Sequence, residues 1–340
     1  MPDRDALITG FLDRAGWGAA ARGPLAGDAS FRRYDRLMAG EDRAVLMDAP
    51  PPQEDVRPFA MIARHLDRLG LSAPQILAED TAAGLLLLED LGDDTYTRVL
   101  AAPDGPGEEA LYALAVDVLI DLHKRDRTDA LPEGLPAYDE AKLLDEALLL
   151  TDWYMPAILG RETPAEIRDG YEESWRRVLA PAMAAPPHLV LRDYHVDNLI
   201  WLPDRDGVAR CGLLDFQDAV AGHAAYDLMS LIEDARRDIA PDLHGRMLAR
   251  YRNAFPALMQ DNGAWAAFER DFAVLAAQRH AKVIGIFTRL WRRDAKPDYL
   301  VHIPRVWRLL ERALAHPALA PVAEWFAANL APEHRRKPEA

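Results

Sequence analysis

The sequence predicts an α+β fold with two lobes, a small antiparallel β lobe followed by a larger and mainly helical lobe. Apolar residues over 29–88 are spaced as two strands, a helix and two further strands, whereas the apolar spacing beyond them is almost all helical. The exception is residues 189–216, where short apolar runs predict three short strands. We therefore predict lobes at residues 1–92 and 93–333, and a charged, frayed tail at residues 334–340.

The elements of the smaller lobe follow from apolar spacing and from turn residues. Phe59, Ile62 and Leu66 fall on one face of a helix, and Gly40 lies in a turn between two strands. We predict helices at residues 4–15 and 56–69, and strands at residues 30–37, 44–47, 76–78 and 85–88.

The larger lobe is predicted in the same way. We expect strands at residues 189–191, 199–202 and 211–214. We expect helices at residues 108–124, 139–150, 164–180, 224–237, 241–259, 264–293 and 304–316.

Composition excludes several classes of function. The 340 residues are 50% hydrophobic, which is enough for a sizeable core, and the formal net charge is −15. An acidic chain argues against binding nucleic acids or anionic membranes, because both need positive charge. The single cysteine, Cys211, excludes a disulfide framework. No apolar stretch is long enough to cross a bilayer and no signal-peptide-like run begins the chain, so we expect a cytoplasmic protein of undetermined oligomeric state.

The stretch that indicates chemistry places Asp193 five residues before Asn198, with Asp215 seventeen residues further on, behind an apolar run. Phosphoryl transfer needs a positioned nucleophile and neutralisation of the developing charge. Asp193 can orient an acceptor hydroxyl, while Asn198 and Asp215 supply the oxygen ligands that Mg²⁺ prefers.

An acidic loop with a hydrogen-bonded asparagine is the alternative for the Asp193 spacing alone. Phe216 after Asp215, the helix that starts near residue 224 and the strand order of the smaller lobe favour the catalytic interpretation. A P-loop kinase is excluded, because no Gly-Lys-Ser or Gly-Lys-Thr occurs.

With these motifs, residues 27–310 resemble the aminoglycoside phosphotransferase-type small-molecule kinases, relatives of the protein kinases. The resemblance implies a bilobal protein-kinase-like fold, ATP as phosphate donor and Mg²⁺ as cofactor. Four stretches look like the anomeric N-acetylmuramate/N-acetylglucosamine kinases of peptidoglycan recycling, namely residues 29–34, 47–51, 215–220 and 278–282. That subgroup transfers the ATP γ-phosphate to the C1 hydroxyl of an amino sugar, which would be the substrate here.

The resemblance also implies nucleotide-binding residues. Backbone groups of Glu89 and Leu91 would bind adenine, and Ser30 would lie in the turn that covers the phosphates. The usual lysine of the third strand is missing, since that strand reads Val-Leu-Met. We expect Arg32 or Arg33 to supply the cation, although a surface arginine is an equal alternative.

Several further residues receive roles by their position relative to the motif. His195 is expected to contact a phosphate or the acceptor, or alternatively to brace the loop. Asp227 is expected to be a structural brace of the catalytic loop. Gln217 and Asp218 follow the metal-binding aspartate and could face the sugar.

The helix near residue 280 carries Gln278, Lys282 and Arg289 along one face. This basic stripe suits the lactyl carboxylate of N-acetylmuramate, and its alternative is a solvated helix face.

Two rival functions stay open at this point. One is a kinase of the same fold for another hydroxyl acceptor, such as an aminoglycoside, choline or homoserine. The other is a non-catalytic nucleotide-binding module.

Overall fold

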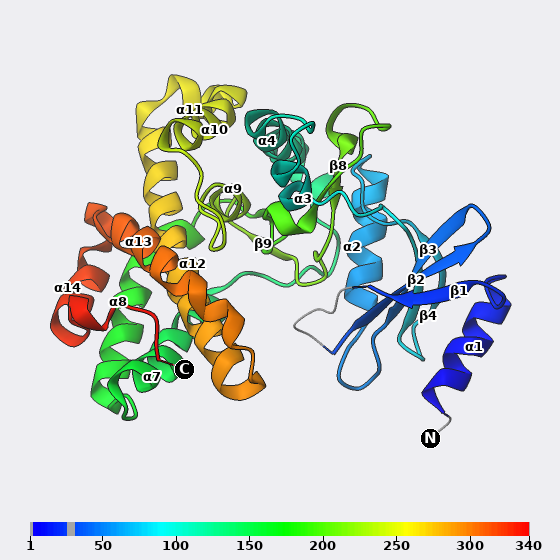
Figure 1. The fold of residues 1–340 in the computed structure, drawn as a ribbon. Coiled ribbons are helices and arrows are strands. Elements are labelled where there is room, and N and C mark those ends of the chain that lie inside the picture. Colours follow the sequence, from blue (N-terminus) through cyan, green and yellow to red (C-terminus); the bar gives the residue numbers. More distant parts are fainter. Residues whose placement is uncertain (1–2, 26–30, 340) are drawn as a thin grey trace. The chain divides into compact units, whose positions relative to one another are not determined.

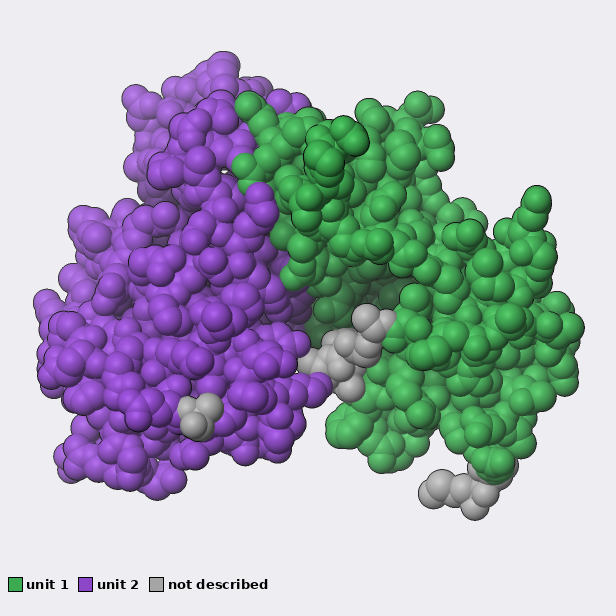
Figure 2. Space-filling model, in the orientation of Figure 1, with its two compact units in different colours: residues 1–118, 196–219 green, residues 119–195, 220–340 purple. Residues whose placement is uncertain are grey.

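The computed structural model describes residues 3–25 and 31–339 (Figure 1). The chain divides into two compact units. Unit 1 consists of residues 1–118 and 196–219, and unit 2 consists of residues 119–195 and 220–340 (Figure 2). These units are groups of mutually contacting residues, whereas the boundary predicted after residue 92 follows the change from strands to helices.

Unit 1 contains a five-stranded antiparallel sheet with the strand order β1-β2-β3-β5-β4. Its strands are β1 (Ala21–Pro24), β2 (Arg33–Ala39), β3 (Asp42–Asp48), β4 (Ile76–Asp80) and β5 (Leu85–Glu89). The two predicted strand pairs are present. Strand β1 was not predicted, because its Ala-Arg-Gly-Pro sequence has no apolar alternation and lies largely exposed at the sheet edge.

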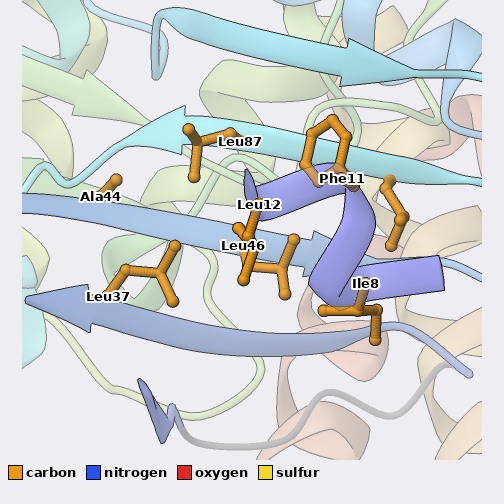
Figure 3. Packing of buried hydrophobic residues seen from close by; sticks show 8 residues of the cluster. Ile8, Phe11, Leu12, Leu37, Ala44, Leu46 and Leu87 are labelled. Carbon is orange, nitrogen blue, oxygen red and sulfur yellow. The ribbon is translucent and has the colours of Figure 1, made fainter. Parts of the chain in front are cut away.

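Helix α1 (Arg4–Arg14) covers part of one face of this sheet. Ile8, Phe11 and Leu12 are buried at positions that share one helix face, and they pack in one cluster with Leu46 and Leu87 of the strands (Figure 3). Burying such aliphatic and aromatic side chains contributes about 1.5–3 kcal/mol each. The predicted amphipathic helix therefore packs its apolar face against the sheet and completes the hydrophobic core there.

A short hairpin from much later in the chain belongs to unit 1. Strands β7 (Leu199–Trp201) and β8 (Cys211–Leu213) pair with each other. The amide of Leu213 donates to the carbonyl of Ser72 at 2.7 Å, and the amide of Trp201 donates to the carbonyl of Asp94 at 2.8 Å. The remaining helical elements are α2 (Arg57–Arg68), α3 (Tyr96–Ala101), the start of α4 (Glu108–Lys124), η2 (Val196–Asn198) and η3 (Gly207–Arg210).

Unit 2 is mainly helical. Its longer helices are α6 (Glu140–Ala147), α8 (Ala165–Met183), α9 (Ala225–Ile232), α10 (Pro241–Ala254), α12 (Asn262–Asp294), α13 (Ile303–Leu314) and α14 (Ala320–Asn329). Its shorter helical elements are α5 (Arg127–Ala130), η1 (Leu150–Tyr154), α7 (Met155–Leu159), α11 (Pro256–Gln260), η4 (Pro297–His302), η5 (Pro317–Leu319) and η6 (Pro332–His334). Unit 2 also contains strands β6 (His188–Val190) and β9 (Val220–Gly222), which pair with each other. Across the described residues, no helix combines the length and apolar character needed to cross a membrane.

The 33-residue helix α12 forms the centre of unit 2. It packs against α6, α9, α13 and η1, so residues around most of its circumference are buried. A Cβ atom on Gly285 would lie 2.4 Å from the backbone carbon of Leu149, just before η1. Glycine is therefore needed for this close approach of the two backbones.

The segment predicted to be a frayed tail makes contacts with the rest of unit 2, and its fraying stays a prediction. The Tyr154 hydroxyl donates to the carbonyl of Arg336 at 2.7 Å and accepts from its amide at 3.0 Å. Tyr154 is fully buried, so its hydroxyl needs partners, and the chain end supplies them.

A buried histidine makes the stability of unit 2 dependent on pH. His123 lies edge-on to His188, with ring centroids 4.9 Å apart, and its Nδ1 is 2.8 Å from the Tyr251 hydroxyl. Burial, together with the nearby His188 and His223, lowers the pKa of His123 to about 3. The unfolded state therefore binds this proton more readily, and acid favours unfolding.

We predict that His123 reduces the free energy of unfolding by about 1.4 kcal/mol per pH unit as the pH falls from about 6 toward 3. Urea unfolding of the native chain and of His123→Asn between pH 4 and pH 7 measures this slope. In His123→Asn the free energy of unfolding should fall less steeply with decreasing pH, by about 1.4 kcal/mol per pH unit, because one titrating group is removed. An unchanged slope would contradict the assignment.

Candidate active site

Unit 1 places Asn198 and Asp215 next to each other. Asn198 ends the single turn η2 directly before β7, and Asp215 lies two residues after β8. Leu199 pairs with Leu213 across the hairpin, and the Leu214 amide donates to the Asn198 carbonyl at 2.9 Å. The beginning of one strand thus meets the end of the other, and the Asn198 Nδ2 lies 3.5 Å from the Asp215 Oδ2.

The second oxygen of Asp215 faces two nitrogen donors. Its Oδ1 accepts from the Gln217 Nε2 at 2.8 Å and lies 3.4 Å from the Arg32 Nη2. The backbone φ of Asp215 is +58°, in the left-handed region that aspartate tolerates better than most residues. The next residue, Phe216, is fully buried and stacks on Phe59 of α2 with ring centroids 4.9 Å apart, which anchors this turn.

A divalent metal fits this pair of side chains. Asp215 offers a carboxylate and Asn198 a carboxamide oxygen, and Mg²⁺ in nucleotide sites takes one or two protein oxygens together with phosphates and water. Within residues 3–25 and 31–339, no group of three or more His, Cys, Asp or Glu side chains is arranged to hold a metal. A donor set of two side-chain oxygens suits a metal that also binds a phosphate ligand.

The two arginines expected near the phosphates have different surroundings. The Arg33 side chain is 70% exposed and its Nη2 contacts the buried Asp48 carboxylate at 3.1 Å. Arg32 is only 10% exposed and lies beside Asp215. Of the two arginines, Arg32 therefore lies next to the predicted metal ligand. Ser30, which was predicted to lie in the phosphate-covering turn, is outside the described residues.

The segment after β5 was predicted to bind adenine through its backbone. The Glu89 amide donates to the Gln75 carbonyl at 2.8 Å, so the backbone carbonyl of Glu89 is the group that suits the predicted adenine contact. The Glu89 carboxylate forms an ion pair with Arg205 at 2.5 Å. Among the described residues, the Leu91 amide has no hydrogen-bond partner. A Cβ on Gly212 would lie 3.2 Å from the Leu91 side chain, so this glycine lets β8 pack closely beneath the segment.

In unit 2, a buried carboxylate holds the backbone of the loop that carries Asp193. Asp227 of α9 accepts hydrogen bonds from the amides of Leu191 at 2.6 Å and Arg192 at 2.9 Å. Burial raises the pKa of Asp227 to about 7, although the two amides lower it in part. Arg192 has φ +70°, a strained conformation for a non-glycine residue, and these bonds help to maintain it.

Cationic side chains surround Asp193, which keeps 39% of its side chain exposed. The Arg279 Nη1 lies 3.8 Å from the Asp193 Oδ1. Burial raises the pKa of Asp193, but the cations Arg279, Lys282 and Arg192 lower it by more, and the net pKa lies below its usual value. Asp193 is therefore ionised at neutral pH.

The predicted basic stripe on α12 is not a solvated face. Gln278 and Lys282 are both buried. The Gln278 Nε2 donates to the Leu143 carbonyl at 2.9 Å, and the Lys282 Nζ lies 3.0 Å from the Glu146 Oε1. Arg289 is half-buried, and burial followed by the neighbouring Arg293 lowers its pKa. The solvated alternative is therefore wrong for Gln278 and Lys282, because other helices of unit 2 cover this side of α12.

His195 and Asp218 have contrasting environments. His195 is buried with its Nε2 3.4 Å from the Arg236 Nη1, while Asp218 is exposed. Burial lowers the pKa of His195, with Asp234 opposing and Arg236 adding to the effect, so its ring is neutral at pH 7. The predicted phosphate contact of His195, and the sugar contacts of Gln217 and Asp218, stay predictions.

Sequence reasoning missed two residues of this region. Glu146 forms ion pairs with both Arg192 and Lys282. Arg279 contacts Asp193, although only its neighbours on the helix were assigned roles. Arg279 stood inside one of the stretches that carried the family resemblance, whereas no sequence signal linked Glu146 to Arg192, 46 residues later.

Comparison with known proteins decides the family. The model of the phosphotransferase enzyme family matches residues 22–268. The chain belongs to this family. The resemblance drawn from the sequence is thereby confirmed.

Relatives match the phosphotransferase chain over nearly its full length. A protein of Caulobacter vibrioides named N-acetylmuramate/N-acetylglucosamine kinase is 38% identical, with 98% of this chain and 99% of the relative covered. A protein of the same name from Pseudomonas aeruginosa is 40% identical, with 95% and 94% covered.

Solved structures of low sequence identity share the fold. The choline kinase LicA of Streptococcus pneumoniae aligns with a TM-score of 0.61 at 12% identity, over 93% of this chain and 98% of that one. The ternary complex of the aminoglycoside phosphotransferase APH(2″)-IIa with streptomycin and ATP aligns with a TM-score of 0.55 at 18% identity, over 94% and 98%. The predicted kinase-like α+β fold is confirmed.

Glu146 gives a direct test of the buried charges in this phosphotransferase. In Glu146→Gln, Arg192 and Lys282 would lose the carboxylate they share, and leaving buried cations uncompensated costs about 3–5 kcal/mol. We predict a loss of that size in the free energy of unfolding, measured with urea. Glu140→Gln on the same helix removes an exposed pair with Arg176 and should cost less than about 1 kcal/mol. Equal losses in the two variants would contradict the prediction.

Proposed function

We propose that this phosphotransferase uses ATP and Mg²⁺ to phosphorylate the C1 hydroxyl of N-acetylmuramate and N-acetylglucosamine. The observation that carries the proposal is the identity of 36–40% to four relatives bearing that kinase name, over at least 87% of each chain. Because ATP is the proposed donor, we also propose that the reaction takes place in the cytoplasm.

The charges around Asp193 support this class of acceptor. Three cations, Arg192, Arg279 and Lys282, are grouped in unit 2 with two carboxylates, Glu146 and Asp193. The cations near Asp193 outweigh the effect of burial on its pKa, and this positive field favours a neutral or anionic acceptor, such as a sugar with a lactyl carboxylate, over a polycationic aminoglycoside.

In the proposed reaction, Asp193 orients the C1 hydroxyl and accepts its proton while the C1 oxygen bonds to the γ-phosphorus. The bond between that phosphorus and the bridging oxygen breaks, and ADP leaves. Asn198 and Asp215 would hold Mg²⁺, which neutralises phosphate charge. Arg32 adds a fixed positive charge beside Asp215 and replaces the missing strand lysine. The carbonyl of Glu89 and the amide of Leu91 would bind adenine.

The proposal is tested with purified protein, ATP, Mg²⁺ and a panel of acceptors, with ADP release and ³¹P NMR as readouts. A C1 phosphate on both amino sugars is expected. Preferential phosphorylation of an aminoglycoside, choline or homoserine would replace the proposed substrate. Nucleotide binding without any turnover would instead indicate a non-catalytic module.

Two substitutions separate the proposed roles of the acidic residues. Asp193→Asn should lower kcat by about 10²- to 10⁴-fold, because proton acceptance is lost, and leave ATP affinity nearly unchanged. Asp215→Ala should abolish the Mg²⁺-dependent part of nucleotide binding measured by calorimetry. Asp204→Asn, an exposed residue of the same hairpin, should match the native chain in both assays. Equal effects of Asp193→Asn and Asp215→Ala on nucleotide affinity would contradict the assignment.

A further inference from the structure

We propose that Arg279 is the positioning residue of Asp193, holding its carboxylate ionised and in one orientation from the protein side. The inference rests on the proposed function, in which Asp193 accepts the proton of the acceptor hydroxyl. Arg279 acts through Asp193 and does not touch the substrate.

Burial separates the roles of the two side chains. Arg279 lies on α12 with 7% of its side chain exposed, whereas 39% of the Asp193 side chain is exposed. The Arg279 Nη1 and Asp193 Oδ1 are 3.8 Å apart. The guanidinium therefore meets the carboxylate from inside unit 2, which leaves an exposed part of Asp193 for the acceptor hydroxyl.

The position of Arg279 is itself fixed by neighbouring aromatic residues. Its guanidinium carbon lies 5.7 Å from the centroid of the Tyr226 ring. The Tyr226 hydroxyl is 3.0 Å from that of Tyr138, which in turn donates to Glu146. A chain of contacts thus runs from α6 through Tyr138 and α9 to Arg279, so that the cation beside Asp193 is held in place.

The other cations near Asp193 are less suited to this role. Arg192 and Lys282 both form ion pairs with Glu146. In contrast, the single carboxylate within 4 Å of Arg279, among the described residues, is that of Asp193. A buried guanidinium is costly without a counter-charge, so this arrangement ties Arg279 to Asp193.

The charged and titratable groups that face Asp193 come from three elements. Arg192 and His195 lie on its own loop, Arg279 and Lys282 on α12, and Asp227 on α9. Asp227 and Asp193 disfavour each other's ionisation. Loss of the Arg279 charge would leave that repulsion less compensated, so the pKa of Asp193 would rise and its orientation would loosen.

The test compares Arg279→Met with Arg279→Lys in steady-state kinetics. For Arg279→Met we expect kcat to fall roughly 10- to 100-fold, with KM for ATP and for the sugar nearly unchanged. The acid limb of the kcat–pH profile should move to higher pH, because the carboxylate must be ionised to accept a proton. Arg279→Lys keeps the charge and should restore part of the loss. Arg292→Met, an exposed residue of the same helix, should behave as the native chain.

A second variant covers the case in which Arg279→Met does not fold. Tyr226→Phe keeps the ring but removes the hydroxyl, which favours the charged form of Arg279, and should lower kcat a few-fold, with an unchanged melting temperature as the folding control. The double variant Arg279→Lys/Tyr226→Phe should lose less than the product of the single effects, because both act through one contact. Native kcat in both single variants, or an unmoved acid limb, would overturn the proposal.

One measurement distinguishes failure of this inference from failure of the proposed function. The pKa of Asp193 is measured by ¹³C NMR of labelled aspartate carboxyls, with Asp193→Asn to identify its signal, in native protein and in Arg279→Met, which removes the charge. A higher pKa in the variant supports the Arg279 role even if no amino sugar is phosphorylated. An identical pKa refutes it even if the sugar kinase activity is present.

Discussion

Two buried cations of unit 2, Arg192 and Lys282, share one carboxylate, Glu146. Arg192 and Lys282 come from different elements, and each would be costly to bury without a negative partner. Glu146 pairs with both and also accepts from Tyr138. Because Arg192 directly precedes Asp193, the placement of this carboxylate on α6 also restricts the loop on which the proposed proton acceptor lies. The direction of the Glu146 pKa, lowered by Lys282 and Arg192 against the effect of burial, agrees with an ionised group that both cations need.

Both loops with proposed catalytic roles contain a strained, non-glycine backbone. Arg192 and Asp215 have φ values of +70° and +58°, and such conformations persist only where surrounding contacts enforce them. Asp227 supplies those contacts for the first loop through two amide hydrogen bonds. For the second loop, the stacking of Phe216 on Phe59 serves the same purpose. A buried carboxylate thus stabilises the strained backbone in unit 2, and aromatic stacking stabilises it in unit 1.

Much of the fold could be predicted because strong local patterns agree with it. Helices α1, α2, α4, α8 and α12, and strands β2 to β8, lie close to their predicted positions. Elements with weak patterns were missed or misjudged. Strand β9 has three residues, and the predicted helix 224–237 ends at Ile232 in the structure. Such short elements are stabilised by pairing partners and by packing, which local spacing does not encode.

The sequence by itself determined the two strand pairs of the small sheet, the Asp193, Asn198 and Asp215 motif, and the family. These features are encoded over a few consecutive residues or by fixed spacing. Only the tertiary structure decided that Gln278 and Lys282 are buried, that Glu146 neutralises Arg192, and that Arg279 reaches Asp193. A charged helix face has the same sequence pattern whether water or another helix covers it. Its counter-charge can come from any point of the chain, so which carboxylate meets which cation is settled by packing alone.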